Sequence, residues 1–121
     1  MNVTINECYE LDSDYQNQFL GIEVFPEPNY KKLKVAERSV NKVHYKDVYI
    51  LEPSRYYYVT FNEKLSSLNG ISALKINKKF YLNGLIFSLD YDKDRIFIFN
   101  ASQNIIYIQK GTKIGEVISH G

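Results

Sequence analysis

The sequence predicts an all-β domain, and three observations lead to that prediction. Apolar residues alternate with polar residues or form short apolar runs, as they do in strands. Eighteen of the 121 residues are aromatic, eleven of them tyrosine, and aromatic side chains favour the pleated surface of a sheet. Helical spacing is confined to one stretch, 77–82, which stops at Asn83-Gly84. We therefore expect about ten short strands and at most one short helix near residues 77–83.

The expected strands follow one another with turn residues between them. Val3 and Ile5 alternate with polar neighbours and mark the first strand. The other expected strands are 19–25, 43–50, 56–61, 85–89, 95–99, 105–108 and 114–118. Several runs, such as 56–61 and 95–99, are apolar at consecutive positions, which is typical of strands in the interior of a sandwich or roll.

The chain has the size of a single domain. Its 121 residues, 45% of them hydrophobic, are enough to bury a core. Neither a linker, an internal repeat nor a low-complexity tract divides the sequence, so we expect one domain over residues 1–121.

The overall charge and the cysteine content exclude several classes of protein. The formal charge is +1, which argues against a large electrostatic grip on nucleic acid or on an anionic membrane. Cys8 is the single cysteine, so neither an intramolecular disulfide nor a cysteine-rich zinc site is expected. The sequence has neither a long apolar run nor a signal segment, and we therefore expect a soluble cytoplasmic protein.

The charges are unevenly distributed along the chain. Residues 1–30 hold six acidic residues and no lysine or arginine, a charge of −6. Residues 31–46 hold six basic residues against one glutamate, a charge of +5. Two interpretations follow: the segments dock onto a partner or onto sister subunits, or they lie side by side and neutralise each other within one chain.

Four motifs occur in a set order from residue 51 onwards. They are Leu51-Glu52-Pro53-Ser54 with the strand 58–63 after it, the segment 70–85 ending in Asn83-Gly84-Leu85, the strand 95–100 ending in Asn100, and 111–118, Gly-Thr-Lys-Ile-Gly-Glu-Val-Ile. The stretch 18–25 matches a first strand more weakly. Together they resemble the trimeric dUTPase and dCTP deaminase superfamily. The resemblance implies a dUTPase-like β-clip, an all-β, jelly-roll-like domain.

The chain departs from this family at the positions that would bind phosphate. The family uses an Arg-Ser-Ser turn, because a guanidinium and two hydroxyls donate several hydrogen bonds to phosphate oxygens. Counted back from Gly84, those positions are Asn77, Lys78 and Lys79. Two lysines can still attract phosphate as point charges, and the alternative interpretation is a solvated turn.

Asp90 is the weak candidate for a catalytic residue. By the resemblance it matches the water-activating aspartate of the dUTPases. The intervals from Gly84 to Asp90 and from Asp90 to Asn100 are shorter than in the family, so the hairpin that holds the base is trimmed. Without it, the dry site that a general base requires is lost. The alternative is that 90–94 forms a polar hairpin turn.

Deaminase chemistry is excluded by the resemblance at one position. That branch activates water with a glutamate three residues before the asparagine, where this chain has Phe97. By the same resemblance we expect the glycine-rich lid that closes the dUTPase site to be absent, because three residues follow Ile118 in the sequence. We therefore expect no enzymatic turnover of dUTP or dCTP.

Two classes of function follow from these observations. The sequence favours a non-catalytic dUTPase-like binding or assembly module, of phage or mobile-element type, that acts through protein–protein contacts. The alternative is a divergent nucleotide-binding protein or a dUTPase-type nucleotide hydrolase, which would use Lys78, Lys79 and Asp90 and require Mg²⁺. Otherwise no cofactor and no metal site is expected, since His44 and His120 lack partners at ligand spacing. The resemblance implies a homotrimer, and the many aromatic residues favour self-association into that or another small homo-oligomer.

Overall fold

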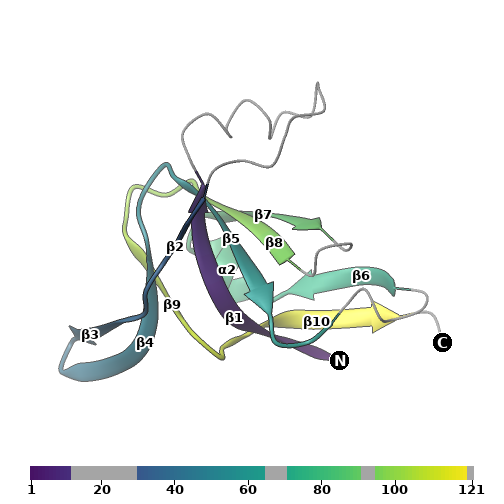
Figure 1. Ribbon diagram of the computed structural model, residues 1–121, viewed down its shortest axis with the longest axis horizontal. Helices are drawn as coiled ribbons and strands as arrows, with labels where there is room; N and C mark the ends of the chain where they lie inside the picture. Colours follow the sequence, from purple (N-terminus) through teal and green to yellow (C-terminus); the bar gives the residue numbers. More distant parts are fainter. Residues whose placement is uncertain (12–29, 65–70, 91–94, 120–121) are drawn as a thin grey trace.

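A computed structural model describes residues 1–11, 30–64, 71–90 and 95–119 of the chain (Figure 1). In this part the chain forms β1 (Asn2–Leu11), β2 (Tyr30–Lys32), β3 (Ala36–Val40), β4 (Val43–Leu51), β5 (Tyr56–Phe61), β6 (Ile71–Ile76), α2 (Lys78–Leu82), β7 (Leu85–Asp90), β8 (Arg95–Asn100), β9 (Ile106–Gln109) and β10 (Lys113–Ser119). The predicted all-β class with one short helix is confirmed, and α2 lies within the expected range. The expected strand 19–25 lies outside the described residues.

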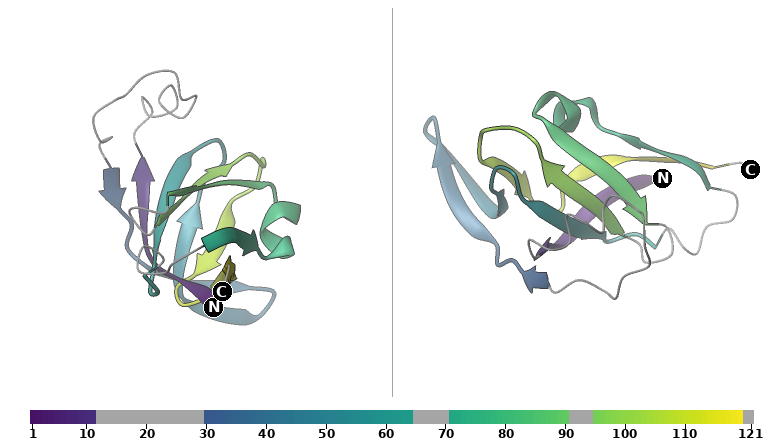
Figure 2. Two further views of the ribbon diagram at one scale, coloured as in Figure 1. Left: turned by 90° about the vertical axis from the view of Figure 1, so that its right-hand side faces the viewer. Right: turned by 90° about the horizontal axis from the view of Figure 1, so that it is seen from above.

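The strands form two antiparallel sheets that curl around one core (Figure 2). The larger sheet has seven strands in the order β6-β10-β1-β5-β8-β7, with β2 paired to β1. The smaller sheet has the order β3-β4-β9. Strand β1 pairs with β10 through its first residues, with β2 through its last residues and with β5 along most of its length. Register shifts within β1 accompany these changes of partner and let the sheet bend.

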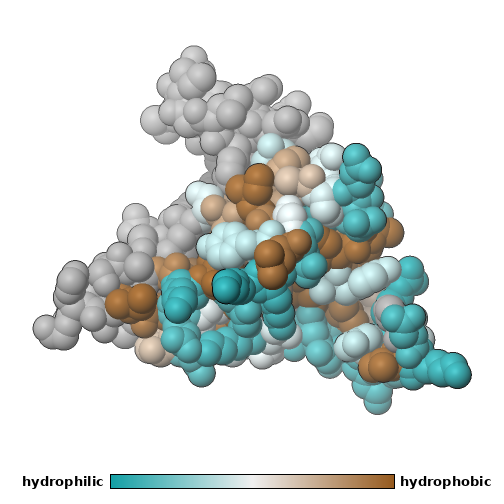
Figure 3. Space-filling view, turned by 180° about the vertical axis from the view of Figure 1, so that it is seen from behind, coloured by the Kyte–Doolittle hydropathy of each residue, from teal (hydrophilic) through white to brown (hydrophobic). Residues whose placement is uncertain are grey.

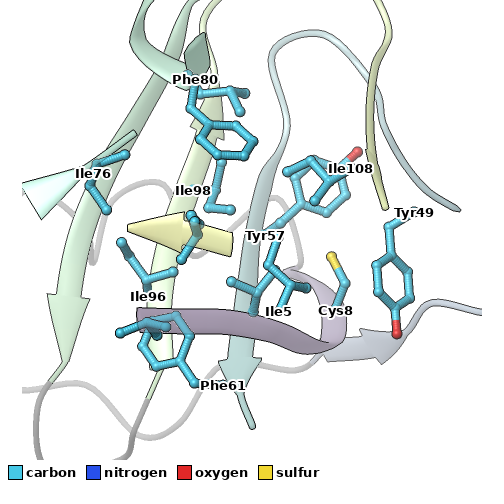
Figure 4. Close-up of a cluster of buried hydrophobic side chains, with 14 of the residues drawn as sticks. Ile5, Cys8, Tyr49, Tyr57, Phe61, Ile76, Phe80, Ile96, Ile98 and Ile108 are labelled. Carbon is cyan, nitrogen blue, oxygen red and sulfur yellow. The ribbon is translucent and has the colours of Figure 1, made fainter. Parts of the chain in front are cut away.

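The interior strands β5 and β8 are apolar on both faces, as the sequence predicted. Their inward side chains join the main core, where Tyr57 and Ile98 are almost completely buried (Figure 4). The intervening residues Tyr58 and Phe97 face the other way and form a second cluster with Leu11. Burial on both sides explains why these runs show no polar alternation.

Strands β3 and β4 form a hairpin that projects from the body of the protein (Figure 1). Asn41 and Lys42 join the strands with φ values of 50° and 68°, the backbone signs of a type I′ turn. The first half of β4 is exposed, whereas Val48, Tyr49 and Leu51 at its other end are buried. We call residues 36–47 the hairpin arm.

The short helix α2 is fixed at both ends. The Asn77 side chain accepts a hydrogen bond from the Lys79 N–H (3.2 Å) and caps its start. Gly84 follows the helix with φ of +91°, and a Cβ at this position would lie 3.0 Å from the Cβ of Ser102. Phe80 is the buried residue of the helix and packs edge-on against Phe87 of β7. Within the described residues, no helix combines the length and apolarity needed to cross a membrane.

Candidate functional site

A groove of about 470 Å³ lies between the hairpin arm, β9 and α2. Its lining comes from segments far apart in the sequence: Arg38, Tyr45 and Val48 of the small sheet, Lys79, Phe80 and Asn83 at the helix, residues 104–109, and Thr112. The face of the molecule in Figure 3 shows apolar residues in small groups among polar ones. The groove therefore gathers cationic, aromatic and amide side chains around one strand.

Two cations line this groove, Arg38 from the hairpin arm and Lys79 from α2. The Arg38 Nε donates a hydrogen bond to the Tyr107 hydroxyl (3.1 Å), and its guanidinium carbon lies 5.4 Å from the centre of that ring. The Lys79 Nζ lies 5.1 Å from the centre of the Phe80 ring. Among the described residues that line the groove, none is acidic. The site is therefore suited to an anionic ligand.

Asn100 is buried behind the turn that leads into the groove-lining residues 104–109. Its side chain is fully buried, and its amide nitrogen donates to the carbonyls of Leu51 (3.0 Å) and Asn104 (2.9 Å). Its amide oxygen accepts from the N–H and the hydroxyl of Ser102. Because every hydrogen-bonding group of the side chain is used, Asn100 fixes the turn that presents Asn104 and Ile105 to the groove.

The candidate phosphate-binding residues lie at α2. Asn77 uses its side-chain oxygen to cap the helix, and its N–H donates to the carbonyl of Ile114 (2.8 Å). Lys78 and Lys79 are exposed, but Lys79 alone of these three residues lines the groove. The structure therefore brings one of the three sequence candidates to the groove.

Asp90 lies at the other end of β7 from these residues. It is the last residue of β7, opposite Arg95 of β8, and its side chain lies outside the described part of the structure. Strand β7 begins at Leu85, directly after the α2 turn, so its five residue steps put about 17 Å between the two ends of the strand. The lysines of α2 and Asp90 thus belong to opposite ends of β7.

Phe97, which the resemblance aligned with the deaminase glutamate, belongs to a different surface. Together with Tyr9, Tyr30, Tyr58 and Arg95 it forms what we call the aromatic face, on the outside of β1, β2, β5 and β8. The Tyr9 and Tyr58 rings stack at 4.6 Å, and Tyr30 meets each ring edge-on. The Arg95 guanidinium lies 4.9 Å from the ring centres of both Tyr58 and Phe97.

The acidic and basic segments meet within one chain, in the part that can be described. Glu7 of β1 forms an ion pair with Lys32 of β2 (3.1 Å) and accepts a hydrogen bond from the Tyr9 hydroxyl. Both contacts hold the pKa of Glu7 below its usual value, and the hydrogen bond from Tyr9 has the larger effect. The Glu7–Lys32 pair supports mutual neutralisation over docking between subunits. The other acidic residues of the first segment, apart from Glu10, lie outside the described residues.

The cysteine and the histidine show no catalytic arrangement in the described part. Cys8 is completely buried in the core, and burial raises the pKa of its thiol. His44 lies on the hairpin arm, where it contacts the Ser39 hydroxyl (3.1 Å) and Glu37 (3.3 Å). Within the described ranges, no three histidine, cysteine or acidic side chains gather as a metal site would require. His120 lies outside the described residues.

Sequence patterns did not identify Arg38, Tyr45, Tyr107 or Gln109 as site residues. Arg38 and Tyr107 are 69 positions apart and come together because β9 pairs with β4, which in turn pairs with β3. The sequence offers no local signal for that pairing. The nearest signal in the sequence was the basic segment 31–46, which contains Arg38.

Comparison with known proteins finds no match for this chain, either among protein families or among curated sequences. The resemblance to the dUTPase and dCTP deaminase superfamily thus rests on the motifs given above.

Proposed function

We propose that this chain is a non-catalytic, dUTPase-like binding or assembly module that acts through contacts with other protein chains. One observation carries the proposal: the groove lies along a strand at the edge of the small sheet and is lined by two cations and no described acid. An open strand edge is a surface that other polypeptides recognise. The proposal includes a phage or mobile-element origin and a cytoplasmic location.

The placement of the catalytic candidates supports a protein without turnover. A hydrolase holds its general base within hydrogen-bonding reach of the water that attacks the bound phosphate. Here Lys78 and Lys79 precede β7, whereas Asp90 ends it, and Asn77 is engaged in capping α2. Phe97 is part of the aromatic face and has no proton to exchange.

The projecting hairpin arm supports assembly. Val43 and Tyr45 of the arm are 49% and 41% exposed, and exposed apolar side chains that lie together mark interaction surfaces. An interface on the arm would remove them from water. We propose self-association into a homotrimer or another small homo-oligomer, and the same surfaces can receive a different protein.

Two measurements on the purified chain test this function. Light scattering coupled to size exclusion is expected to give a mass above the 14.2 kDa of one chain. Thermal unfolding with dUTP or dCTP and Mg²⁺ is expected to show no stabilisation, because a ligand that binds only the folded state must raise its stability. A mass of one chain at all concentrations, together with stabilisation by a nucleotide, would contradict the proposal.

A second candidate function is nucleotide binding without hydrolysis. It is favoured by the shared groove of Arg38 and Lys79, which attract phosphate, and Tyr45 and Tyr107, whose rings can stack on a base. Its test is the same melting experiment on Lys79→Gln and on Lys34→Gln, an exposed lysine outside the groove. Nucleotide binding predicts stabilisation that Lys79→Gln reduces and Lys34→Gln leaves intact.

A further inference from the structure

Strand β9 has one edge open to the groove. In the described part it pairs with β4 alone, with Ile108 opposite Tyr49 and Tyr107 opposite Ile50. The Lys110 N–H donates to the carbonyl of Asp47 (2.8 Å), which continues the same register by one residue pair. Since hydrogen-bonded and non-hydrogen-bonded pairs alternate in an antiparallel ladder, Ile108 bonds to Tyr49 and Tyr107 directs its N–H and C=O away from β4.

The outward main-chain groups of Tyr107 face an available space. Residues 104–109 all line the groove, and Lys79, Phe80 and Asn83 stand across from them. No described main-chain group pairs with the outward N–H and C=O of Tyr107. The Gln109 carbonyl, by contrast, already accepts from the Thr112 N–H (3.1 Å), so the available edge is centred on Tyr107. A groove of this volume has the size of a site for several residues or a small ligand.

The charges around the edge of β9 favour a negatively charged ligand. Arg38 and Lys79 flank it, and the described lining contains no carboxylate that would repel acidic side chains. Ile105 is 45% exposed beside it and offers an apolar contact. We propose that the groove binds an extended acidic segment of a partner protein, which adds to the small sheet as a strand beside β9. This inference rests on the proposed function and specifies the partner's chemistry.

The open edge favours a peptide over nucleic acid. The phosphate groups along a nucleic-acid backbone only accept hydrogen bonds, so that backbone cannot satisfy the outward carbonyl of Tyr107, whereas a peptide main chain both donates and accepts. The formal charge of +1 is also small for a protein that grips a phosphate backbone. A strand with acidic side chains supplies negative charge, and its main-chain N–H groups can still donate to the outward carbonyl of Tyr107.

Peptides with blocked amides test the pairing directly. The probe is a fluorescein-labelled hexapeptide of alternating aspartate and valine, measured by fluorescence anisotropy. Two further peptides carry N-methyl groups on either the aspartates or the valines. One alternate set of amides faces β9, so one methylated peptide is expected to bind at least about tenfold more weakly, since hydrogen bonds across the edge are lost. The other is expected to bind like the parent.

Variants of the groove test the charges. Arg38→Gln and Lys79→Gln are each expected to weaken binding of the parent peptide about three- to tenfold, more at low salt than at high salt. Lys34→Gln removes an equal charge outside the groove and is the matched control. Replacement of the aspartates in the probe by lysines is expected to abolish binding.

Two variants at Tyr107 test the strand edge from the protein's side. Tyr107→Pro removes the outward N–H, which proline can do on an edge strand without breaking the ladder to β4. Tyr107→Val removes the ring but keeps the N–H. Binding is expected to be lost in the first and largely retained in the second. Circular dichroism checks whether Tyr107→Pro folds. If it does not, binding of the two methylated peptides to the unaltered protein tests the pairing with β9.

Several results would overturn the inference. Equal binding of the two methylated peptides would mean attraction by charge alone. Displacement of the probe by an oligothymidylate or by dUTP would assign the groove to nucleic acid or to a nucleotide. Conversion of an oligomer to single chains by the peptide would make a second copy the occupant. If no peptide binds while the protein remains oligomeric, this inference fails and the proposed function stands. Stabilisation of a single-chain species by dUTP would instead remove the proposed function.

Discussion

The aromatic face and the groove each place an arginine against aromatic rings, but the rings are buried to different extents. In the aromatic face, Arg95 lies against Tyr58 and Phe97, and both rings are less than a tenth exposed. In the groove, Arg38 lies against Tyr107, which is only partly buried, beside an open strand edge. Arginine on tyrosine is therefore not a functional signature by itself. Burial of the rings marks the aromatic face as structural. The partly exposed ring and the open main chain beside it mark the groove as the proposed binding surface.

The sharpest test of this difference compares alanine substitutions on the two surfaces. Tyr58→Ala is expected to lower the free energy of unfolding by about 3 kcal/mol, because it opens a cavity under stacked rings. Tyr107→Ala removes a partly exposed ring and is expected to cost less than about 1 kcal/mol. Urea unfolding followed by circular dichroism measures both.

Tyr58→Phe serves as the control for the aromatic face, since it keeps the ring and removes the hydroxyl alone. Because the Tyr58 hydroxyl has hydrogen bonds with Tyr30 and Arg95, Tyr58→Phe is expected to lower the free energy of unfolding by about 1 kcal/mol, well below the loss for Tyr58→Ala. Equal losses for Tyr58→Ala and Tyr107→Ala would mean that the groove ring is as structural as the aromatic face, and the distinction between the surfaces would fail.

Removal of the buried Asn100 amide is expected to have the next largest effect. Asn100→Ala leaves the carbonyl of Leu51 and the groups of Ser102 without their partner, which is expected to cost about 2 kcal/mol. Because the turn then loosens, peptide binding in the groove is expected to weaken as well. Asn104→Ala is the matched control, since Asn104 contributes its carbonyl to this network and keeps it. Its unfolding free energy is expected to change little.

The strands of the large sheet could be predicted from sequence because each carries its signal locally. Residues 56–61 and 95–99 are apolar at nearly every position, and their burial on both faces is what the pattern requires. The helix was predicted for the same reason, since Asn77 and Gly84 mark its two ends. Local chemistry alone decides these elements.

The groove could not be predicted, because its parts meet only through pairing between distant strands. Strand β3 has polar residues at Glu37, Arg38 and Ser39, so no apolar alternation reveals it. Its turn, Asn41-Lys42, has positive φ values but contains no glycine, which is the residue that usually indicates such a turn in a sequence. The sequence did single out Lys79, but on the ground of a family resemblance and not because it lines a groove beside a strand edge.

Two glycines test how tightly the groove wall is held. Gly84 and Gly111 both have positive φ, at 91° and 84°, so alanine strains the backbone at either site. At Gly84 the new Cβ would also press on Ser102, whereas nothing lies within 4 Å of a Cβ at Gly111. Gly84→Ala is therefore expected to cost about 1–2 kcal/mol and Gly111→Ala about 1 kcal/mol. A larger loss at Gly111 in thermal melts would contradict this account of the wall.

The smallest effect is expected from pH, and it arises at Glu7, which accepts a hydrogen bond from Tyr9 of the aromatic face. The pKa of Glu7 is lowered by its contacts with Tyr9 and Lys32, so the carboxylate stabilises the folded state above its ordinary pKa. This contribution is expected to disappear as the pH falls below about 5 and through the lowered pKa of Glu7. Because Lys32 is 61% exposed, the loss is expected to stay below about 1 kcal/mol. Urea midpoints at neutral and acidic pH should therefore differ less in Glu7→Gln than in the unaltered protein. Lys79→Gln is expected to keep the full difference, since no described carboxylate lines the groove. A flattened pH response in Lys79→Gln would show that an acidic side chain already occupies the groove.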